Sequence, residues 1–294
     1  MERVSDSRRH SPLRVAESPD SDAPLPVNDD GLCTPFIKAH SLEKIRVHNR
    51  FARMFATSMR DKWDTSYIGL YAGPGHARIA GSDLVVQTSA LSVLRQPQLF
   101  NHYVFVEKSP SCVKALSARW RRVAPTANVH IIPKDVHDSI TDVRYYLPKK
   151  RLLGFCFVDP FSAELQFRST IGALTDLRID FLVLLMLGND ARRNFKQYFN
   201  DPNDNRIADL VDRPDWRADY RRDGKPVRFI LNSFTEAMQR RGYPVVSPLP
   251  IYAAGTKVLQ YMLTYYSKDA FGLELWHKCI KSLRRLDSQG QLFE

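Results

Sequence analysis

The sequence predicts an α/β protein built around a doubly wound, mostly parallel sheet. Between residues 67 and 187, five short apolar runs alternate with helical stretches, which is the usual order in such sheets. The runs are apolar at consecutive positions, as strands covered on both faces require. After residue 243, two further strand-like runs are joined by a short turn and must pair antiparallel. We therefore expect right-handed crossovers and a closing antiparallel hairpin.

Composition and charge limit the possible functions. The chain has 294 residues, 44% of them hydrophobic, so it can bury a sizeable core. Lys and Arg number 43 against 32 Asp and Glu, a net charge of +11 that favours an anionic partner such as nucleic acid. A solvated basic face is the alternative. No apolar run reaches the ~18 residues of a membrane span, and no secretion signal is evident, so we expect a cytoplasmic protein without a membrane partner.

The four cysteines lie far apart, without a CxxC pair or a histidine at ligand spacing. This spacing argues against a local zinc site, and a disulfide framework is not expected without a secretion signal. We expect no metal.

The elements follow in order along the chain. Residues 1–34 are rich in Ser, Pro and Asp, and we expect them to form a disordered tail. Ser41 is a suitable N-cap for a first helix, with apolar residues at helical spacing up to Met59. The predicted strands are 67–71, 102–107, 128–132, 152–159 and 180–187, and the helices between them are 82–95, 109–120 and 167–177.

The alternation then stops. Residues 191–242 are polar and basic, and we expect a helical insertion, with its clearest helix at 229–240. The α/β domain would thus comprise 35–190 and 243–294. It closes with strands at 245–252 and 257–266 and a helix at 272–283.

Candidate site residues follow the ends of successive strands, where ligands bind in open α/β sheets. The turn from Tyr71 through Ala72, Gly73 and Gly75 lacks bulk, so the backbone can approach a ligand, although Gly-Pro-Gly also makes ordinary turns. It matches neither GxGxxG nor a phosphate-binding P-loop, and Arg78 at the third glycine position disfavours a nicotinamide enzyme.

Three carboxylates follow other strands. Glu107 can accept hydrogen bonds from vicinal ribose hydroxyls, or it is an acid in the first turn of a helix. Asp135 would lie near an adenine amino group, or it is a loop acid. Asp159 with Pro160 and Phe161 is the candidate reaction site, because Phe161 can stack on a planar substrate; a simple strand-to-loop turn is the alternative.

Two basic residues follow the fifth strand. Arg192 and Arg193 can reach the mouth of the crevice and bind substrate phosphate. A surface charge pair is the simpler interpretation.

The ordered motifs resemble the three-Cys-motif partner protein family. They are YIGLYAGPGHARIAGSD, HYVFVEKSP, GFCFVDPF, DFLVLLML followed by ARRN, and SPLPIYAAGTKVLQYMLTYYSKDAFGLELWHK, within roughly residues 40–282. The resemblance implies a Rossmann-like methyltransferase fold with strand order 3-2-1-4-5-7-6 and a winged-helix-like insertion. It also implies a partner protein that carries three cysteines and a metal cluster.

The same resemblance implies S-adenosylmethionine binding by Gly73 and Gly75, with Glu107 on the ribose and Asp135 near the adenine. Asp159, Pro160 and Phe161 would replace the amino-methyltransferase motif, which usually has two prolines. The first hypothesis is therefore methylation of a nitrogen in nucleic acid or another planar group. The second is a non-catalytic module that recruits nucleic acid or the metal-cluster partner, which the shortened motif favours.

Overall fold

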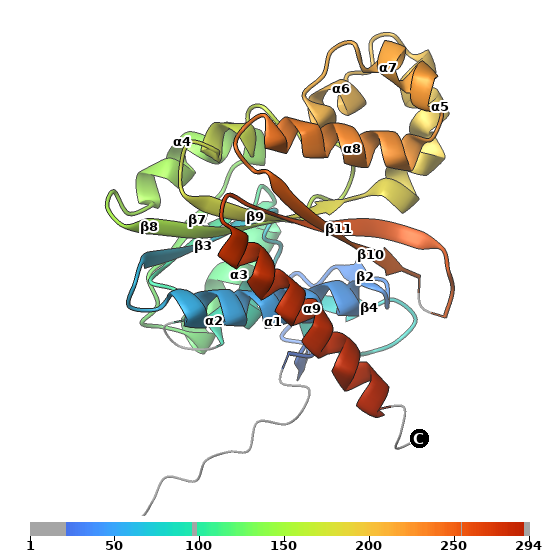
Figure 1. Ribbon diagram of the computed structural model, residues 1–294. Coiled ribbons are helices and arrows are strands. Elements are labelled where there is room, and N and C mark those ends of the chain that lie inside the picture. The colour runs from blue at the N-terminus through green and yellow to red at the C-terminus, as the bar shows by residue number, and fades with distance from the viewer. Residues whose placement is uncertain (1–21, 96–98, 254, 291–294) are drawn as a thin grey trace, which may run out of the picture.

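A seven-stranded sheet forms the centre of the molecule (Figure 1). The computed structural model describes residues 22–95, 99–253 and 255–290. The spatial order of the strands is β10-β11-β9-β8-β3-β6-β7. The strands are β3 (Asp64–Leu70), β6 (His102–Val106), β7 (Val129–Ile132), β8 (Leu152–Val158), β9 (Ile179–Leu185), β10 (Val245–Tyr252) and β11 (Leu259–Ser267).

Strand order and direction confirm the predicted fold. The first five strands are parallel, whereas β11 is antiparallel to both β9 and β10. When these seven strands are numbered along the chain, their order from β7 to β10 is 3-2-1-4-5-7-6. The fold is therefore Rossmann-like α/β with an antiparallel hairpin at one edge.

Helices cover both faces of the sheet (Figure 1). On one face lie α1 (Ser41–Met59), α2 (Ser89–Leu94), α3 (Pro110–Val123) and α9 (Ala270–Gly290). On the other lie α4 (Val136–Tyr146) and α8 (Pro226–Gln239). Phe155 and Phe157 of β8 pack with the first group and Cys156 and Val158 with the second. This alternation is why the strand is apolar at every position. None of the helices in the described part of the chain has the length and apolarity that a membrane span requires.

The helix predicted at 82–95 is wrong over its first half. Residues there form β5 (Val85–Gln87), which pairs with the preceding strand β4 (His76–Ile79), and only α2 is helical. Ser82 does not cap a helix; its hydroxyl donates to Ile79 O and accepts from Leu84 N, which closes a hairpin turn with Gly81 at φ +84°. The Ser82 side chain, which suggested a helix N-cap, therefore stabilises the hairpin turn.

The tail predicted at 1–34 is ordered in part, while residues 1–21 lie outside the described residues. In the tail, β1 (Pro26–Val27) pairs with β5, and directly after it β2 (Phe36–Ile37) pairs with β4, which gives a second, four-stranded sheet. The buried carboxylate of Asp22 binds Arg50 and Arg53 of α1 at 2.9 and 2.6 Å. Strand pairing and ion pairs hold this segment, and neither leaves a signal in its composition.

The helix predicted at 167–177 is also wrong. Only Gly172–Leu174 forms a 3₁₀ turn. Phe167, Ile171 and Leu174 are fully buried at helix-like spacing, but the segment that carries them is irregular. The helix-like spacing of apolar residues therefore arises from the burial of an irregular segment.

The insertion is helical, as predicted, but contains no wing. After a π-helical turn at Leu187–Ala191 it forms α5 (Arg192–Asn200), α6 (Arg206–Val211), α7 (Trp216–Asp223) and α8, and its described residues 191–242 form no strand. The winged-helix-like expectation is therefore wrong. α8 packs on the sheet through Phe234, which contacts Tyr266 of β11, so it serves as a crossover helix.

Candidate functional site

The turn after β3 is built around two glycines with left-handed backbone. Gly73 has φ +65° and Gly75 has φ +85°. A Cβ on Gly75 would lie 2.6 Å from Leu91 Cγ, so close packing under α2 excludes a side chain there. A Cβ on Gly73 would meet nothing within 4 Å, so this part of the turn faces open space. Tyr71 also has positive φ, +63°, an uncommon conformation for a residue with a side chain.

Glu107 joins this turn to the end of β6. Its carboxylate is buried, with Oε2 accepting from Gly73 N at 2.9 Å and Oε1 from Ser109 N at 2.8 Å. Ser109 is the N-cap of α3, so Glu107 precedes the helix and is not one of its first-turn acids. A carboxylate offers about four lone-pair sites, so each oxygen can accept a further hydrogen bond.

Asp135 follows β7 and caps α4. It accepts from His137 N at 3.1 Å and from Lys108 Nζ at 3.2 Å. Partial burial opposes ionisation, but these two donors hold the pKa of Asp135 below its usual value. The side chain is therefore an ionised helix cap as well as a candidate ligand.

A cavity of about 420 Å³ lies beyond the ends of β3, β6, β7 and β8. Sequence-predicted residues Tyr71, Asp135, Pro160 and Phe161 line it together, while Gly73, Gly75, Glu107 and Asp159 do not. The volume is within the range of ordinary small-molecule sites. The predicted residues thus gather at one edge of the sheet, some in the cavity wall and others in the turn beside it.

Asp159 makes an ion pair that the sequence did not reveal. Both of its oxygens accept from Lys44 Nζ of α1, at 2.8 and 2.7 Å, and the two side chains are only 18% and 14% exposed. Phe161, two residues later, is 74% exposed. The candidate carboxylate is therefore already partnered, whereas the candidate stacking ring is free.

The insertion contributes different residues from those predicted. Arg192 and Arg193 are exposed at the start of α5 and are not among the residues that line the cavity, whereas Arg206 and Asp209 of α6 are. Carboxylates within the insertion neutralise many of its arginines. The pairs are Arg206 with Asp204, Arg213 with Asp219 and Glu236, Arg222 with Asp219, Arg228 with Asp223, and Arg241 with Asp212.

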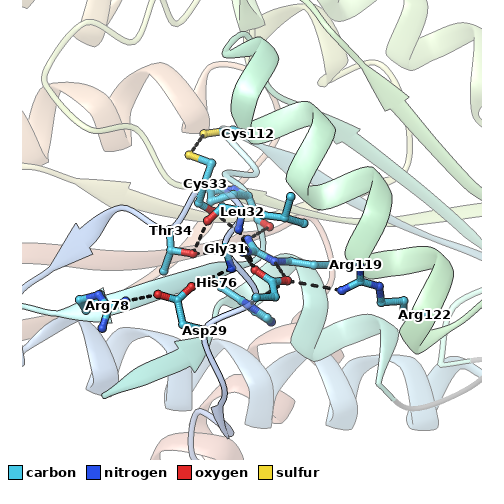
Figure 2. Close-up of polar contacts among 12 residues, drawn as sticks. Asp29, Gly31, Leu32, Cys33, Thr34, His76, Arg78, Cys112, Arg119 and Arg122 are labelled. Carbon is cyan, nitrogen blue, oxygen red and sulfur yellow. Dashed lines mark hydrogen bonds and ion pairs between the residues drawn. The ribbon is translucent and has the colours of Figure 1, made fainter. Parts of the chain in front are cut away.

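Arg119 is a second residue whose role the sequence did not reveal. Its hydrogen bonds link the N-terminal segment to the glycine turn (Figure 2). Its side chain is 2% exposed, and the guanidinium binds both oxygens of Asp30, at 2.9 and 2.5 Å. It also donates to the carbonyls of Cys33 and Pro74, at 2.9 and 2.8 Å. The hydrogen bonds from Arg119 lower the pKa of Asp30 to about 2.

Two free thiols meet at the same place (Figure 2). Cys33 Sγ lies 3.4 Å from Cys112 Sγ, at the start of α3. In the described part of the chain, no group of three or more His, Cys, Asp or Glu residues is arranged to hold a metal ion.

Comparisons with known proteins give matches of fold at low identity. No family model and no curated protein matches the chain in sequence. Protein LPL1258 of Legionella pneumophila is 11% identical with a TM-score of 0.47, covering 80% of this chain and 88% of its own. An O-methyltransferase of Bacillus cereus, solved with SAH, is 14% identical with a TM-score of 0.42, covering 75% and 80%. TomG of Streptomyces achromogenes, an O-methyltransferase solved with SAM, is 14% identical with a TM-score of 0.39, covering 75% and 79%. Since these TM-scores are all below 0.5, function is inferred from this chain's own strand order and site residues.

Proposed function

We propose that this protein is an S-adenosylmethionine-dependent methyltransferase that acts on a planar nitrogen group, with nucleic acid as the substrate class. One observation carries the proposal: the buried carboxylate of Glu107 is hydrogen-bonded to Gly73 N at the carboxyl edge of the sheet. β3 and β8 are neighbours in the sheet, but the chain continues from β3 toward β6 and from β8 toward β9, on opposite sides of this pair. The carboxyl ends of β3 and β8 therefore form the topological switch point, where ligands bind in open α/β sheets.

The residues at this edge fit the cofactor. Glu107 has acceptor capacity left for two ribose hydroxyls, and Gly73 presents backbone without a side chain to open space. Asp135 and Tyr71 line the cavity where the adenine would lie, and the carboxylate of Asp135 can accept from its amino group. The bound cofactor supplies a methyl group on a positively charged sulfur, which leaves as a neutral thioether.

The acceptor would bind beside Phe161, whose exposed ring can stack on a planar group. The Pro160 carbonyl and Asp159 would accept from the amino group and orient its lone pair in line with the methyl carbon. Alignment of this kind can supply ~7–11 kcal/mol of the barrier reduction. The nitrogen forms the new bond to carbon and then loses its proton to solvent.

A binding module is the second candidate function. The ion pair between Lys44 and Asp159 favours it, because the ammonium takes the hydrogen-bonding positions that an acceptor amine would use. In this form the chain would keep the fold and recruit nucleic acid or a three-cysteine metal-cluster protein in the cytoplasm. The quoted motifs support placing the chain in the three-Cys-motif partner family in either case.

Calorimetric titration with S-adenosylmethionine tests the cofactor site. We expect saturable binding by the natural protein and loss of binding in Glu107→Ala and Gly73→Val. Asp138→Ala, which removes an exposed carboxylate from the first turn of α4, is the matched control and should bind normally. Thermal melting by circular dichroism shows whether each variant is folded. A folded natural protein that binds no cofactor at millimolar concentration would refute the proposal.

Methyl-transfer assays on single-stranded DNA and RNA then separate the two candidates. Phe161→Ala should keep cofactor affinity and lose transfer if the protein is an enzyme. Cofactor binding without transfer to any nitrogen acceptor would favour the binding module.

A further inference from the structure

A second cavity, of about 520 Å³, lies between the edge strand β10 and α9. Its apolar lining includes Pro248 and Leu249 of β10 and Ile280 of α9. Its cationic lining includes Lys281 and Arg284, which are exposed. We call this cavity the α9 groove. It combines an apolar surface with exposed positive charge.

Two cations of the α9 groove, Lys281 and Arg284, are not neutralised as the arginines of the insertion are. Residues 277–285 (HKCIKSLRR) contain four Lys and Arg and no acid. Among the residues that the structure describes, no carboxylate forms an ion pair with Lys281 or Arg284. The insertion, by contrast, pairs Arg206, Arg213 and Arg228 with its own carboxylates. An anionic partner therefore finds available cations in the α9 groove.

The edge of the sheet limits what can occupy the groove. Within the described part of the chain, β10 is the outermost strand of the sheet and pairs on one side only, with β11. It carries Pro248 and Pro250, which have no backbone N–H to offer to an additional strand. Prolines of this kind protect an edge against strand addition. The occupant is therefore recognised by side chains rather than by strand pairing.

We propose that the α9 groove binds single-stranded nucleic acid, with phosphates on Lys281 and Arg284 and bases against Pro248, Leu249 and Ile280. Sites for single strands combine cations that follow the backbone with side chains, usually aromatic, on which unpaired bases stack. In the α9 groove, Pro248, Leu249 and Ile280 would offer an aliphatic surface to the bases instead. A duplex keeps its bases stacked inside and would leave the apolar lining unused. This binding needs neither the cofactor nor methyl transfer, and it lies on a surface separate from the strand-end cavity.

Fluorescence anisotropy with labelled oligonucleotides of about 12 nucleotides, dT and rU, tests the proposal on the full chain. Lys281→Glu with Arg284→Glu should weaken binding at least tenfold. Lys149→Glu with Lys150→Glu is the matched control, because it changes net charge equally at two exposed lysines near the end of α4. The control should change affinity by no more than about twofold, the effect of long-range charge alone.

Salt dependence and the apolar lining give a second measurement. Loss of two phosphate contacts should make the slope of log K against log salt shallower by about 1.4, at ~0.7 per contact for single strands. Leu249→Ser should weaken binding while leaving that slope unchanged, because it alters a base contact and no charge.

Several outcomes would overturn the proposal. They are no saturable binding by the natural protein, equal weakening by the groove and control variants, equal or tighter binding of a duplex of the same length, or equal competition by polyglutamate. Melting temperatures confirm that the variants are folded. Cofactor titration of the groove variant should match the natural protein, so failure here is distinguishable from failure of the methyltransferase proposal.

Discussion

The buried carboxylate of Asp180 should make the stability of this protein fall as pH rises from 4 to 7. Asp180 is the second residue of β9, and its oxygens accept from Tyr265 Oη at 2.5 Å and Ser267 Oγ at 3.0 Å. Burial opposes the charged form more than these two donors favour it, which raises the pKa of Asp180 from 3.8 to about 6. The folded protein therefore holds a proton at pH 5 that the unfolded chain has released.

The sign and size of the effect follow from this difference in proton binding. The stabilisation is complete well below pH 3.8, where both states are protonated, and is lost progressively as pH rises through about 6. A shift of this size, at 1.36 kcal/mol per pKa unit, corresponds to about 3 kcal/mol. Asp180→Asn removes the titration but keeps one acceptor and one donor for the two hydroxyls.

Urea unfolding of both proteins at intervals from pH 4 to 7 measures the effect. The free energy of unfolding of the natural protein should fall by about 2 kcal/mol relative to Asp180→Asn across this range, because part of the full effect is already lost at pH 4, while all other titrations cancel in the difference. Asp176→Asn is the control, because the Arg144 guanidinium lowers the pKa of that exposed carboxyl and gives the opposite sign. A constant difference between the natural protein and Asp180→Asn would refute the reasoning.

Three further predictions concern the glycine turn and the contacts that hold the N-terminal segment beside it. Arg119→Met should lower the free energy of unfolding by ~3–5 kcal/mol in urea, because it leaves Asp30 and two carbonyls without their buried donor; a loss below 1 kcal/mol would show that the guanidinium is dispensable. Oxidation with diamide above pH 9 should join Cys33 to Cys112 within one chain, although burial raises the pKa of the Cys112 thiol to about 11. Closing that loop should add up to ~4 kcal/mol, read as a higher melting temperature that Cys33→Ser abolishes. Gly75→Ala should destabilise by ~3 kcal/mol, since its φ is +85° and the new Cβ would clash with the side chain behind it; unchanged melting would contradict this geometry.

The sheet could be predicted because its signal is local. The run from Leu152 to Val158 is apolar at every position since alternate residues enter two different cores. Once the strands are located, residues such as Glu107 and Asp135 follow at their ends, and the parallel order brings those ends to one edge. Local sequence patterns were therefore enough to place the candidate cofactor-binding residues at the carboxyl ends of the strands.

The contacts that complete the site could not be predicted, because they join distant parts of the chain. Lys44 reaches Asp159 across 115 positions, and Arg119 reaches Asp30 across 89. Each looks like an ordinary basic residue on a helix face, the commonest position for Lys and Arg. A charged residue on a helix carries no local sign of whether it faces solvent or a buried carboxylate.

In the proposed methyltransferase, the ion pair between Lys44 and Asp159 determines how an acceptor can bind. Both partners are largely buried, so removing one leaves a charge without compensation, and α1 cannot move away from the strand end at little cost. An amine acceptor is itself a hydrogen-bond donor and competes with the ammonium for the same two oxygens. An acceptor that binds there must either displace Lys44 or use the Pro160 carbonyl and the exposed Phe161 ring alone. In a catalyst, Lys44→Met would therefore lower KM for the acceptor by removing the competing donor, whereas a binding module would show no transfer with either residue.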